Sequence, residues 1–297
     1  MSIPNPPRKN HYVPCFYTSL WTGTDGMLCE FSRPYDRVKP SRKHPNATGY
    51  SIDLYTEAAL KPEQRTHLED KFLKLLDNRA CDALRMIVTD DIDGLTPKQR
   101  IDWARFILSM MQRSPSKIAE LRRRWRAEYR KPHPELEQEY LERRLPTDPP
   151  TLTELLEQTS EEALGRGQVQ ILQMVMGGLP KVGLKIINMI WGVLTIPDLP
   201  TKFLTSDRPI IRTNGIGKPE AYVTVPIGPR KLFFAANEQK TIDWIKAQQA
   251  SDLIRNVNAT VVGQAEKYVY GESDYLRNFV EIHLPRRTED RIEQAAS

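Results

Sequence analysis

Three side chains suited to proton transfer or nucleophilic attack stand at two distant places in the sequence. His11 opens an aromatic segment, and Ser206 with Asp207 ends the run that begins at Phe203. The unperturbed pKa of histidine lies near neutrality, so His11 could act as a general base or a metal ligand. Serine, histidine and a carboxylate are the residue types used for acyl or phosphoryl transfer. We therefore predict His11, Ser206 and Asp207 as catalytic residues, provided that the fold brings them together.

Each of these residues also has a structural interpretation. A lone histidine can hydrogen-bond a sheet edge, and a Ser-Asp pair before Pro209 can satisfy its own backbone in a turn. The Gly-x-Ser-x-Gly pattern, which exposes a nucleophilic serine, does not surround Ser206. Both interpretations stay open.

Arg113 is the fourth catalytic candidate, because it ends an otherwise apolar helical run. Its planar guanidinium could hold a phosphate or carboxylate with two hydrogen bonds. It could equally cap helix carbonyls or form a buried ion pair with Asp207. Gln112 and Asn258 are predicted as binding residues.

The segment from Ile118 to Arg130 is strongly basic and predicts a helix. Its aromatic residues, Trp125 and Tyr129, fall at helical spacing with Ile118 and so favour a core rather than a base-stacking surface. The arginines could bind the phosphates of nucleic acid, or form a solvated face. The residues predicted for such binding are Arg122, Arg123, Arg126 and Arg130.

The sequence predicts no metal site and leaves the cofactor undetermined. It contains no His-Glu-x-x-His, Cys-x-x-Cys or phosphate-loop pattern. Gly215-Ile-Gly217 is not followed by a helical pattern, so it is not a dinucleotide fingerprint.

The elements that must position these residues follow from the hydrophobic periodicity. Strands are expected over residues 27–31, 50–55, 189–196, 203–207, 222–227 and 231–235, with extended segments at 260–262 and 268–270. Helices are expected over residues 62–87, 97–113, 118–130, 135–145, 151–176, 241–255 and 274–281. Thr96-Pro97 has the cap-then-proline order of a helix start, residues 33–48 resemble a surface loop, and Trp244 should face inward.

Strands precede and follow a long helical block, which predicts an α+β fold. We expect a mostly antiparallel sheet built from N-terminal and C-terminal strands, with the helical block 62–178 inserted between them. The chain is predicted to form a single domain over residues 1–297, with loose tails at 1–10 and 286–297.

Composition indicates a soluble globular protein. The chain has 297 residues, 39% of them hydrophobic and 27% charged, with a formal net charge of +5. The three cysteines lack metal-ligand spacing, and the most apolar run is too short to cross a bilayer. We expect a cytoplasmic protein with no membrane partner, and the oligomeric state is not predicted.

Several short motifs together resemble one bacterial family. They are Asn10-His11-Tyr12-Val13-Pro14, Leu68-Glu69, Gln112-Arg113-Ser114-Pro115, the run Phe203–Pro209, and the closing segments after Val225 and Asn256. Their order is similar to that of the family catalogued as domain of unknown function 4238, over roughly residues 8 to 275. The resemblance implies no reaction, and it directs attention to the polar residues of these motifs.

Two function classes follow from these observations. The first is a hydrolase-like enzyme acting on an anionic substrate, such as nucleic acid, with His11, Arg113, Ser206 and Asp207 at one site. The second is a non-catalytic nucleic-acid-binding or interaction protein of a mobile-element or defence system, which would use the basic helix. The expected partner in either case is an anionic ligand or nucleic acid.

Overall fold

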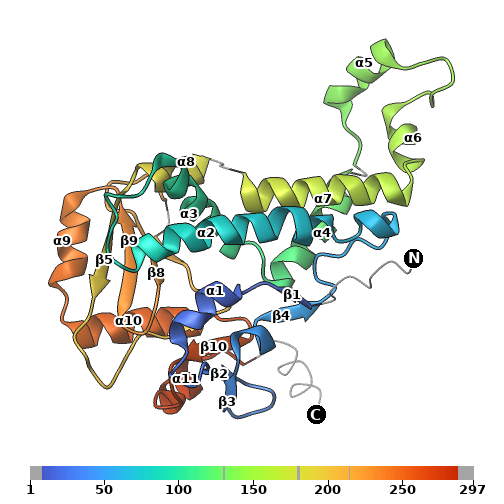
Figure 1. Ribbon diagram of the computed structural model, residues 1–297. Coiled ribbons are helices and arrows are strands. Elements are labelled where there is room, and N and C mark those ends of the chain that lie inside the picture. The colour runs from blue at the N-terminus through green and yellow to red at the C-terminus, as the bar shows by residue number, and fades with distance from the viewer. Residues whose placement is uncertain (1–8, 130, 179–180, 214, 287–297) are drawn as a thin grey trace.

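Figure 1 shows the computed structural model, which describes residues 9–129, 131–178, 181–213 and 215–286. Most of the two predicted tails lies outside these residues. The fold is α+β, as the sequence predicts, with a long helical block between antiparallel strands. No helix in the described part of the chain is long and apolar enough to cross a membrane.

The helical block begins with a single π-helical segment. This segment, η4 (Leu68–Leu73), runs directly into α2 (Lys74–Ile87). The block continues with α3 (Pro97–Met110), α4 (Pro115–Tyr129), α5 (Pro134–Arg143), α6 (Leu152–Glu157), α7 (Glu161–Gly177) and α8 (Lys181–Asn188). The predicted start of α3 is confirmed: Thr96 and Gln99 form a reciprocal capping box, and Pro97 occupies the first turn.

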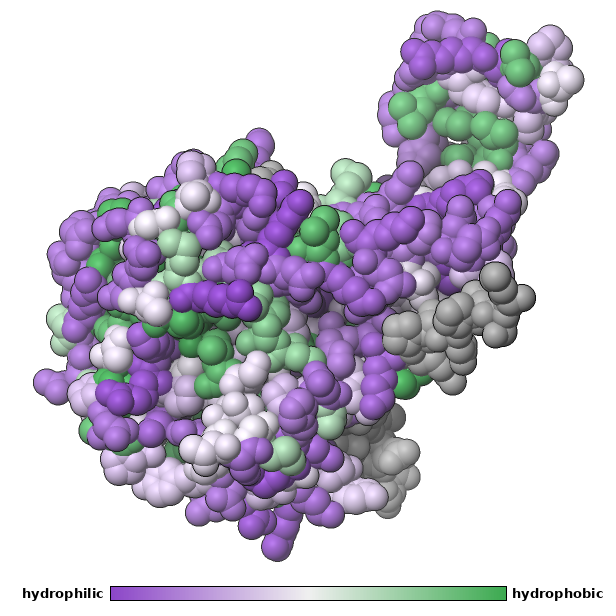
Figure 2. Space-filling view, in the orientation of Figure 1, coloured by the Kyte–Doolittle hydropathy of each residue, from purple (hydrophilic) through white to green (hydrophobic). Residues whose placement is uncertain are grey.

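Two short helices of this block stand apart from the rest. α5 and α6 pack on each other and project as an arm beyond α4 and α7 (Figure 1). Neither has a buried residue. Leu136, Leu141 and Leu145 are exposed on the arm, where Figure 2 shows apolar residues in green.

The strands of the described residues form three antiparallel sheets. The first pairs β1 (Lys9–His11) with β4 (Tyr50–Ile52). The second has the order β3 (Lys39–Lys43), β2 (Leu28–Ser32), β10 (Tyr268–Gly271) and β6 (Thr205–Ser206). The third has the order β5 (Ile190–Thr195), β9 (Lys231–Ala236), β8 (Tyr222–Pro226) and β7 (Ile211–Arg212). The second sheet joins N-terminal and C-terminal strands, as predicted.

The sequence predicts one sheet shared by N-terminal and C-terminal strands, but the strands divide among separate sheets. β8 and β9 are joined by a tight turn at Gly228, whose φ of 142° favours glycine, so they pair locally. β10 instead pairs with β2, far away in the sequence.

Several element boundaries also differ from the sequence prediction. β3 lies in the expected surface loop, because an edge strand tolerates Pro40. The expected extended segment 260–262 is part of α10 (Ala250–Gly263), whose buried face includes Val257 and Val261. Tertiary packing there overrides the β-propensity of the branched residues. The C-terminal half also contains α9 (Gln239–Ala247) and α11 (Arg277–His283). Trp244 on α9 is 56% exposed and does not face inward.

The N-terminal segment ties the sheets to the helices. α1 (Cys15–Thr18) and the 3-10 helices η1 (Ser19–Trp21), η2 (Pro45–Ala47) and η3 (Pro62–Gln64) complete the elements. The Tyr17 hydroxyl lies 2.7 Å from the Thr205 hydroxyl and donates to the Pro226 carbonyl at 2.8 Å. Trp21 donates to the Phe203 carbonyl at 2.9 Å. The aromatic N-terminal segment is therefore core, hydrogen-bonded to two C-terminal strands.

Asp207 holds the turn that leads into β10. Its buried carboxylate accepts hydrogen bonds from the backbone N–H groups of Glu266, Lys267 and Tyr268 at 2.7 to 2.9 Å. Three hydrogen bonds to one carboxylate fix the start of β10, the strand that lies between N-terminal β2 and C-terminal β6.

Asp207→Asn should therefore lower the free energy of unfolding by about 3 kcal/mol at pH 8, since the amide removes a charged acceptor and places an N–H₂ group among donors. Chemical denaturation monitored by circular dichroism would measure this. Asp198→Asn, at an exposed carboxylate, is the control and should change little. Equal stability of the Asp207 variant and the wild type would contradict the structural role.

Candidate functional site

The four predicted catalytic residues occupy two different environments. Ser206 and Asp207 are fully buried in the second sheet, and their polar atoms are used by the fold. The Ser206 hydroxyl accepts the Arg208 N–H at 3.1 Å, and Asp207 holds the residue 266–268 turn. Burial raises the pKa of Asp207 to about 6, although the three N–H donors act in the opposite direction. The turn interpretation of this pair describes its contacts best, so we leave Ser206 and Asp207 out of the candidate site.

Arg113 lies in the other environment and pairs with Asp77, not with Asp207. The guanidinium is 1% exposed and contacts both Asp77 oxygens, at 2.9 and 3.2 Å. Ser109 on α3 accepts a further hydrogen bond from it. Burial is the largest single influence and would lower the pKa of Arg113, but the charge and hydrogen bond of Asp77, together with Tyr55 and Glu69, make the net change upward. Arg113 is thus a positioning residue, because its donors are largely occupied.

His11 lies at the end of β1, beside the Tyr50 ring of β4, with ring centroids 5.6 Å apart. Its Nε2 atom is buried and has no hydrogen-bond partner among the described residues. Burial lowers the pKa of His11, while a backbone hydrogen bond with Asn46 and the charge of Asp77 oppose that shift. A neutral imidazole with an unused ring nitrogen can accept a proton or donate one.

Glu69 is the functional residue that the sequence analysis did not assign to chemistry. It lies in the π-helical segment η4, and such segments occur frequently at functional sites. Its Oε2 atom is buried without a hydrogen-bond partner in the described chain. Burial, followed by the negative charge of Asp77, raises the pKa of Glu69 to about 7. A carboxyl group with this pKa can both release and take up a proton near neutrality.

Asp77 lies at the centre of this cluster. Its charge acts on the pKa values of His11, Glu69, Tyr55 and Cys15, which come from different segments of the chain. The Asp77 side chain is 21% exposed, so the cluster has a limited opening to solvent. Tyr55 closes the other side by donating to the Arg113 carbonyl at 3.2 Å.

A pattern that runs from η4 into α2 could have revealed Glu69 and Asp77. Both lie eight residues apart on one side of the helix, with buried Leu73 between them, next to the apolar stripe. Two carboxylates at the border of the buried face are partly desolvated and indicate partners.

Cys15 does not provide a reactive thiolate. Burial raises the pKa of Cys15 to about 11, and the charge of Asp77 adds to the shift. No group of three or more His, Cys, Asp or Glu residues in the described parts of the chain is arranged to hold a metal ion. Glu69 and His11 are the acid–base candidates of this region, because each has a shifted pKa and each is influenced by the charge of Asp77, which pairs with Arg113.

The predicted binding residues do not join this cluster. Asn258 is buried, accepts the Leu204 N–H at 2.8 Å and donates to the Lys202 carbonyl at 2.9 Å, so it fixes the segment before β6. Gln112 lines a separate cavity of about 550 Å³ between the α3–α4 junction and residues 208–212.

The arginines of α4 are mostly engaged in the fold. Arg122 is half-buried and donates to the Thr56 carbonyl, and Arg126 pairs with Glu161 at 3.0 Å. Arg123 is exposed, and Arg130 lies outside the described residues. The aromatic residues of α4 contact each other, with ring centroids 5.2 Å apart, and Trp125 packs over Gly167 of α7.

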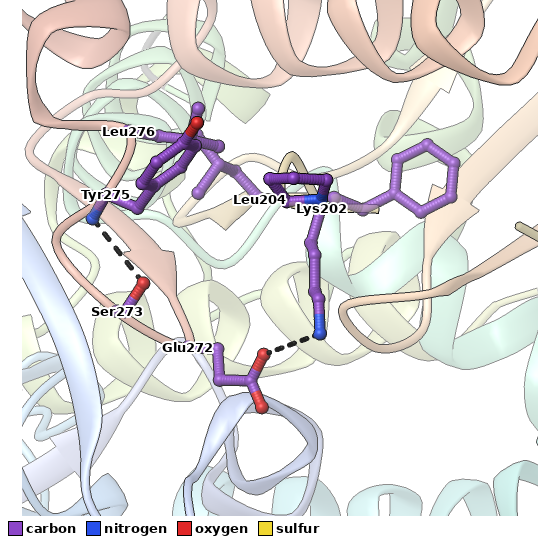
Figure 3. A pocket seen from close by; sticks show the side chains of 8 residues that line it. Lys202, Leu204, Glu272, Ser273, Tyr275 and Leu276 are labelled. Carbon is purple, nitrogen blue, oxygen red and sulfur yellow. Dashed lines mark hydrogen bonds and ion pairs between the residues drawn. The ribbon is translucent and has the colours of Figure 1, made fainter. Parts of the chain in front are cut away.

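Figure 3 shows a cavity of about 280 Å³ between the segment before β6 and the segment after β10. Its charged groups, Lys202 and Glu272, face each other at 3.5 Å. This cavity therefore offers a ligand little unbalanced charge.

The fold and the Asp77 cluster define an α+β protein in which partly buried imidazole and carboxyl groups lie near the Arg113–Asp77 ion pair. The chain belongs to the family described as protein of unknown function (DUF4238), whose model matches residues 9–275. The resemblance drawn from the motifs is confirmed. Comparisons with curated proteins and with solved structures found no match.

Asp77→Asn should reduce the free energy of unfolding by about 3 kcal/mol, because it leaves the buried Arg113 charge without a counter-ion. Denaturant unfolding would measure the loss. The double variant Asp77→Leu/Arg113→Met should recover much of it, since no unpaired charge remains. If Asp77→Asn kept wild-type stability, the pair would not hold the cluster together.

Glu69→Gln should gain stability relative to the wild type as pH rises. The pKa of Glu69 in the folded protein exceeds its ordinary value of 4.5, so its favourable contribution is complete below pH 4.5 and is lost as pH rises through about 7. Thermal unfolding at pH 5 and pH 8 would reveal this, with the exposed neighbour Asp70→Asn as control. A stability difference that stays constant between these pH values would contradict the raised pKa.

Proposed function

We propose that this protein is a hydrolase-like enzyme that uses Glu69 and His11 for acid–base catalysis on an anionic substrate. The observation that carries the proposal is that Glu69 Oε2 and His11 Nε2 are buried without partners among the described residues. Seven other buried polar atoms of the described chain also lack partners, but they belong to Arg, Trp and Gln side chains, which do not exchange protons near neutral pH. Buried polar atoms are rarely left without partners unless water, a ligand or a reaction uses them.

The pKa shifts support this assignment. The Glu69 carboxyl, with a pKa of about 7, is partly protonated at neutral pH and suited to protonate a leaving group. His11, with its pKa lowered, is neutral and suited to accept a proton from water. Water oxygen then bonds to the acyl or phosphoryl centre as the bond to the leaving group breaks. Perturbed carboxyl and imidazole pKa values in one cluster are typical of active sites.

Two features support an anionic substrate. Lys9 lies beside the cluster, with its ammonium 4.7 Å from the Tyr50 ring centroid, and its charge contributes to the lowered pKa of His11. The chain also carries a formal net charge of +5. Both favour the approach of a negatively charged molecule.

The alternative, non-catalytic nucleic-acid binding through α4, has less support. Arg122 and Arg126 already bond to Thr56 and Glu161, so a nucleic acid would have to compete with the fold for them. Its test is salt dependence: an affinity for DNA that falls steeply with salt and drops in Arg123→Gln would favour this alternative.

We also propose that a bacterial cytoplasm is where the enzyme acts. The cysteines Cys15, Cys29 and Cys81 are free thiols, the usual state in a reducing compartment.

Hydrolysis of p-nitrophenyl acetate, p-nitrophenyl phosphate and bis(p-nitrophenyl) phosphate would test the proposal. Glu69→Gln and His11→Gln should each lower kcat on the accepted substrate by a factor of about 100 to 10,000, the usual contribution of a general acid or base. Circular dichroism would verify that the variants are folded. Asp70→Asn, one residue from Glu69 but exposed and paired with Lys74, is the matched control and should keep the wild-type rate.

The pH profile adds a second readout. The wild-type rate should fall as pH rises above about 7, because the Glu69 carboxyl group loses its proton. The rate of Glu69→Gln should not show this decrease. Failure of the wild type to hydrolyse any of the three substrates, or unchanged rates in both variants, would refute the hydrolase proposal.

A further inference from the structure

A second site lies at the α3–α4 junction, and Arg113 is not among the residues that line it. It is the cavity of about 550 Å³ lined by Gln112, Lys117, Arg208, Arg212 and Gln264. Met110, Met111 and Ile210 add an apolar part to its wall. Its volume falls in the range typical of small-molecule sites, and it is larger than the cavity of Figure 3.

The charge of this cavity is one-sided. Lys117, Arg208 and Arg212 are cationic, and the residues that line the cavity include no carboxylate. By contrast, a cavity of about 230 Å³ beside β2 is lined by both Glu30 and Arg33. Arg208 and Lys117 already pair with Glu266 and Glu120, so the unbalanced positive charge that favours an anionic ligand comes from Arg212.

The three cationic side chains differ in whether they already pair with a carboxylate. Arg208 is held by Glu266 at 2.6 Å and by Ser116 at 2.6 Å, so its position is fixed before a ligand arrives. Lys117 pairs with Glu120 at 2.7 Å on the surface. Arg212 is exposed and forms no ion pair among the described residues, so its full set of donors is available.

The wall of the cavity is pre-organised by the Asp207 turn. Gln264 donates to the carbonyls of Arg208 and Ile210, the latter at 3.1 Å. The Glu266 backbone that follows is held by Asp207 at 2.8 Å. A rigid wall reduces the entropy lost on binding.

We propose that this cavity binds a phosphorylated small molecule of nucleotide size. The phosphate would contact Arg212, Arg208 and Lys117, because the planar guanidinium matches phosphate with paired hydrogen bonds. The apolar part of the ligand would pack on Met110, Met111 and Ile210. This site is separate from the Glu69 cluster and does not depend on the proposed reaction.

Isothermal titration calorimetry with AMP would test the proposal, with adenosine as the uncharged probe and inorganic phosphate as the probe without an apolar part. The wild type should bind AMP more tightly than phosphate and should not bind adenosine. Arg212→Gln should weaken AMP binding about tenfold, as expected for the loss of a charge-assisted hydrogen bond. The double variant Arg212→Gln/Lys117→Gln should bind AMP more weakly still.

Arg123→Gln is the matched control, since Arg123 is an exposed arginine of α4 that does not line the cavity. It should bind AMP like the wild type. Absence of AMP binding to the wild type, or equal AMP affinity in the Arg212→Gln/Lys117→Gln double variant, would overturn the proposal. Equal affinity for phosphate and AMP would contradict the proposed packing of the ligand's apolar part against the cavity wall.

Discussion

The buried ion pair between Arg113 and Asp77 is the interaction on which the candidate site depends. It joins the segment just after α3 to the first turn of α2, and its Asp77 charge acts on the pKa values of the surrounding groups. A buried guanidinium is costly unless its counter-ion stays in place, so the pair fixes the spacing of the two helices. The same charge raises the pKa of Glu69, which links the stability of the helical block to the proposed chemistry.

The α3–α4 junction connects this cluster with the rest of the fold. Arg113 faces Asp77, while Ser114, the next residue, accepts a hydrogen bond from Arg208 at 3.2 Å. Arg208 follows Asp207, which secures the start of β10. Short motifs that are far apart in the sequence are therefore joined by side chains that bond to backbone or to each other. Most of the polar residues in the motifs serve this purpose, whereas Glu69 Oε2 and His11 Nε2 are buried without a hydrogen-bond partner in the described chain.

Much of the fold can be predicted from local signals in the sequence. The Thr96-Pro97 cap, the period of α2 and the strands around Gly228 were readable because their causes lie within a few residues. The site was harder, because its geometry is long-range. His11 and Asp207 have the residue types of an active site, but nothing in the sequence shows that three N–H groups near residue 267 occupy the Asp207 carboxylate. Glu69 and Asp77 resemble solvated helix carboxylates until Arg113 and His11 are placed against them.

The pKa of Glu69 in the folded protein is the measurement that tests this account most directly. Carbon-13 NMR of glutamate-labelled protein, with Glu69→Gln to assign the signal, would follow the carboxyl group through a pH titration. A pKa of about 7 is predicted, because burial and Asp77 disfavour the charged form. A pKa near the ordinary 4.5 would show a solvated carboxylate and would contradict its assignment as the general acid.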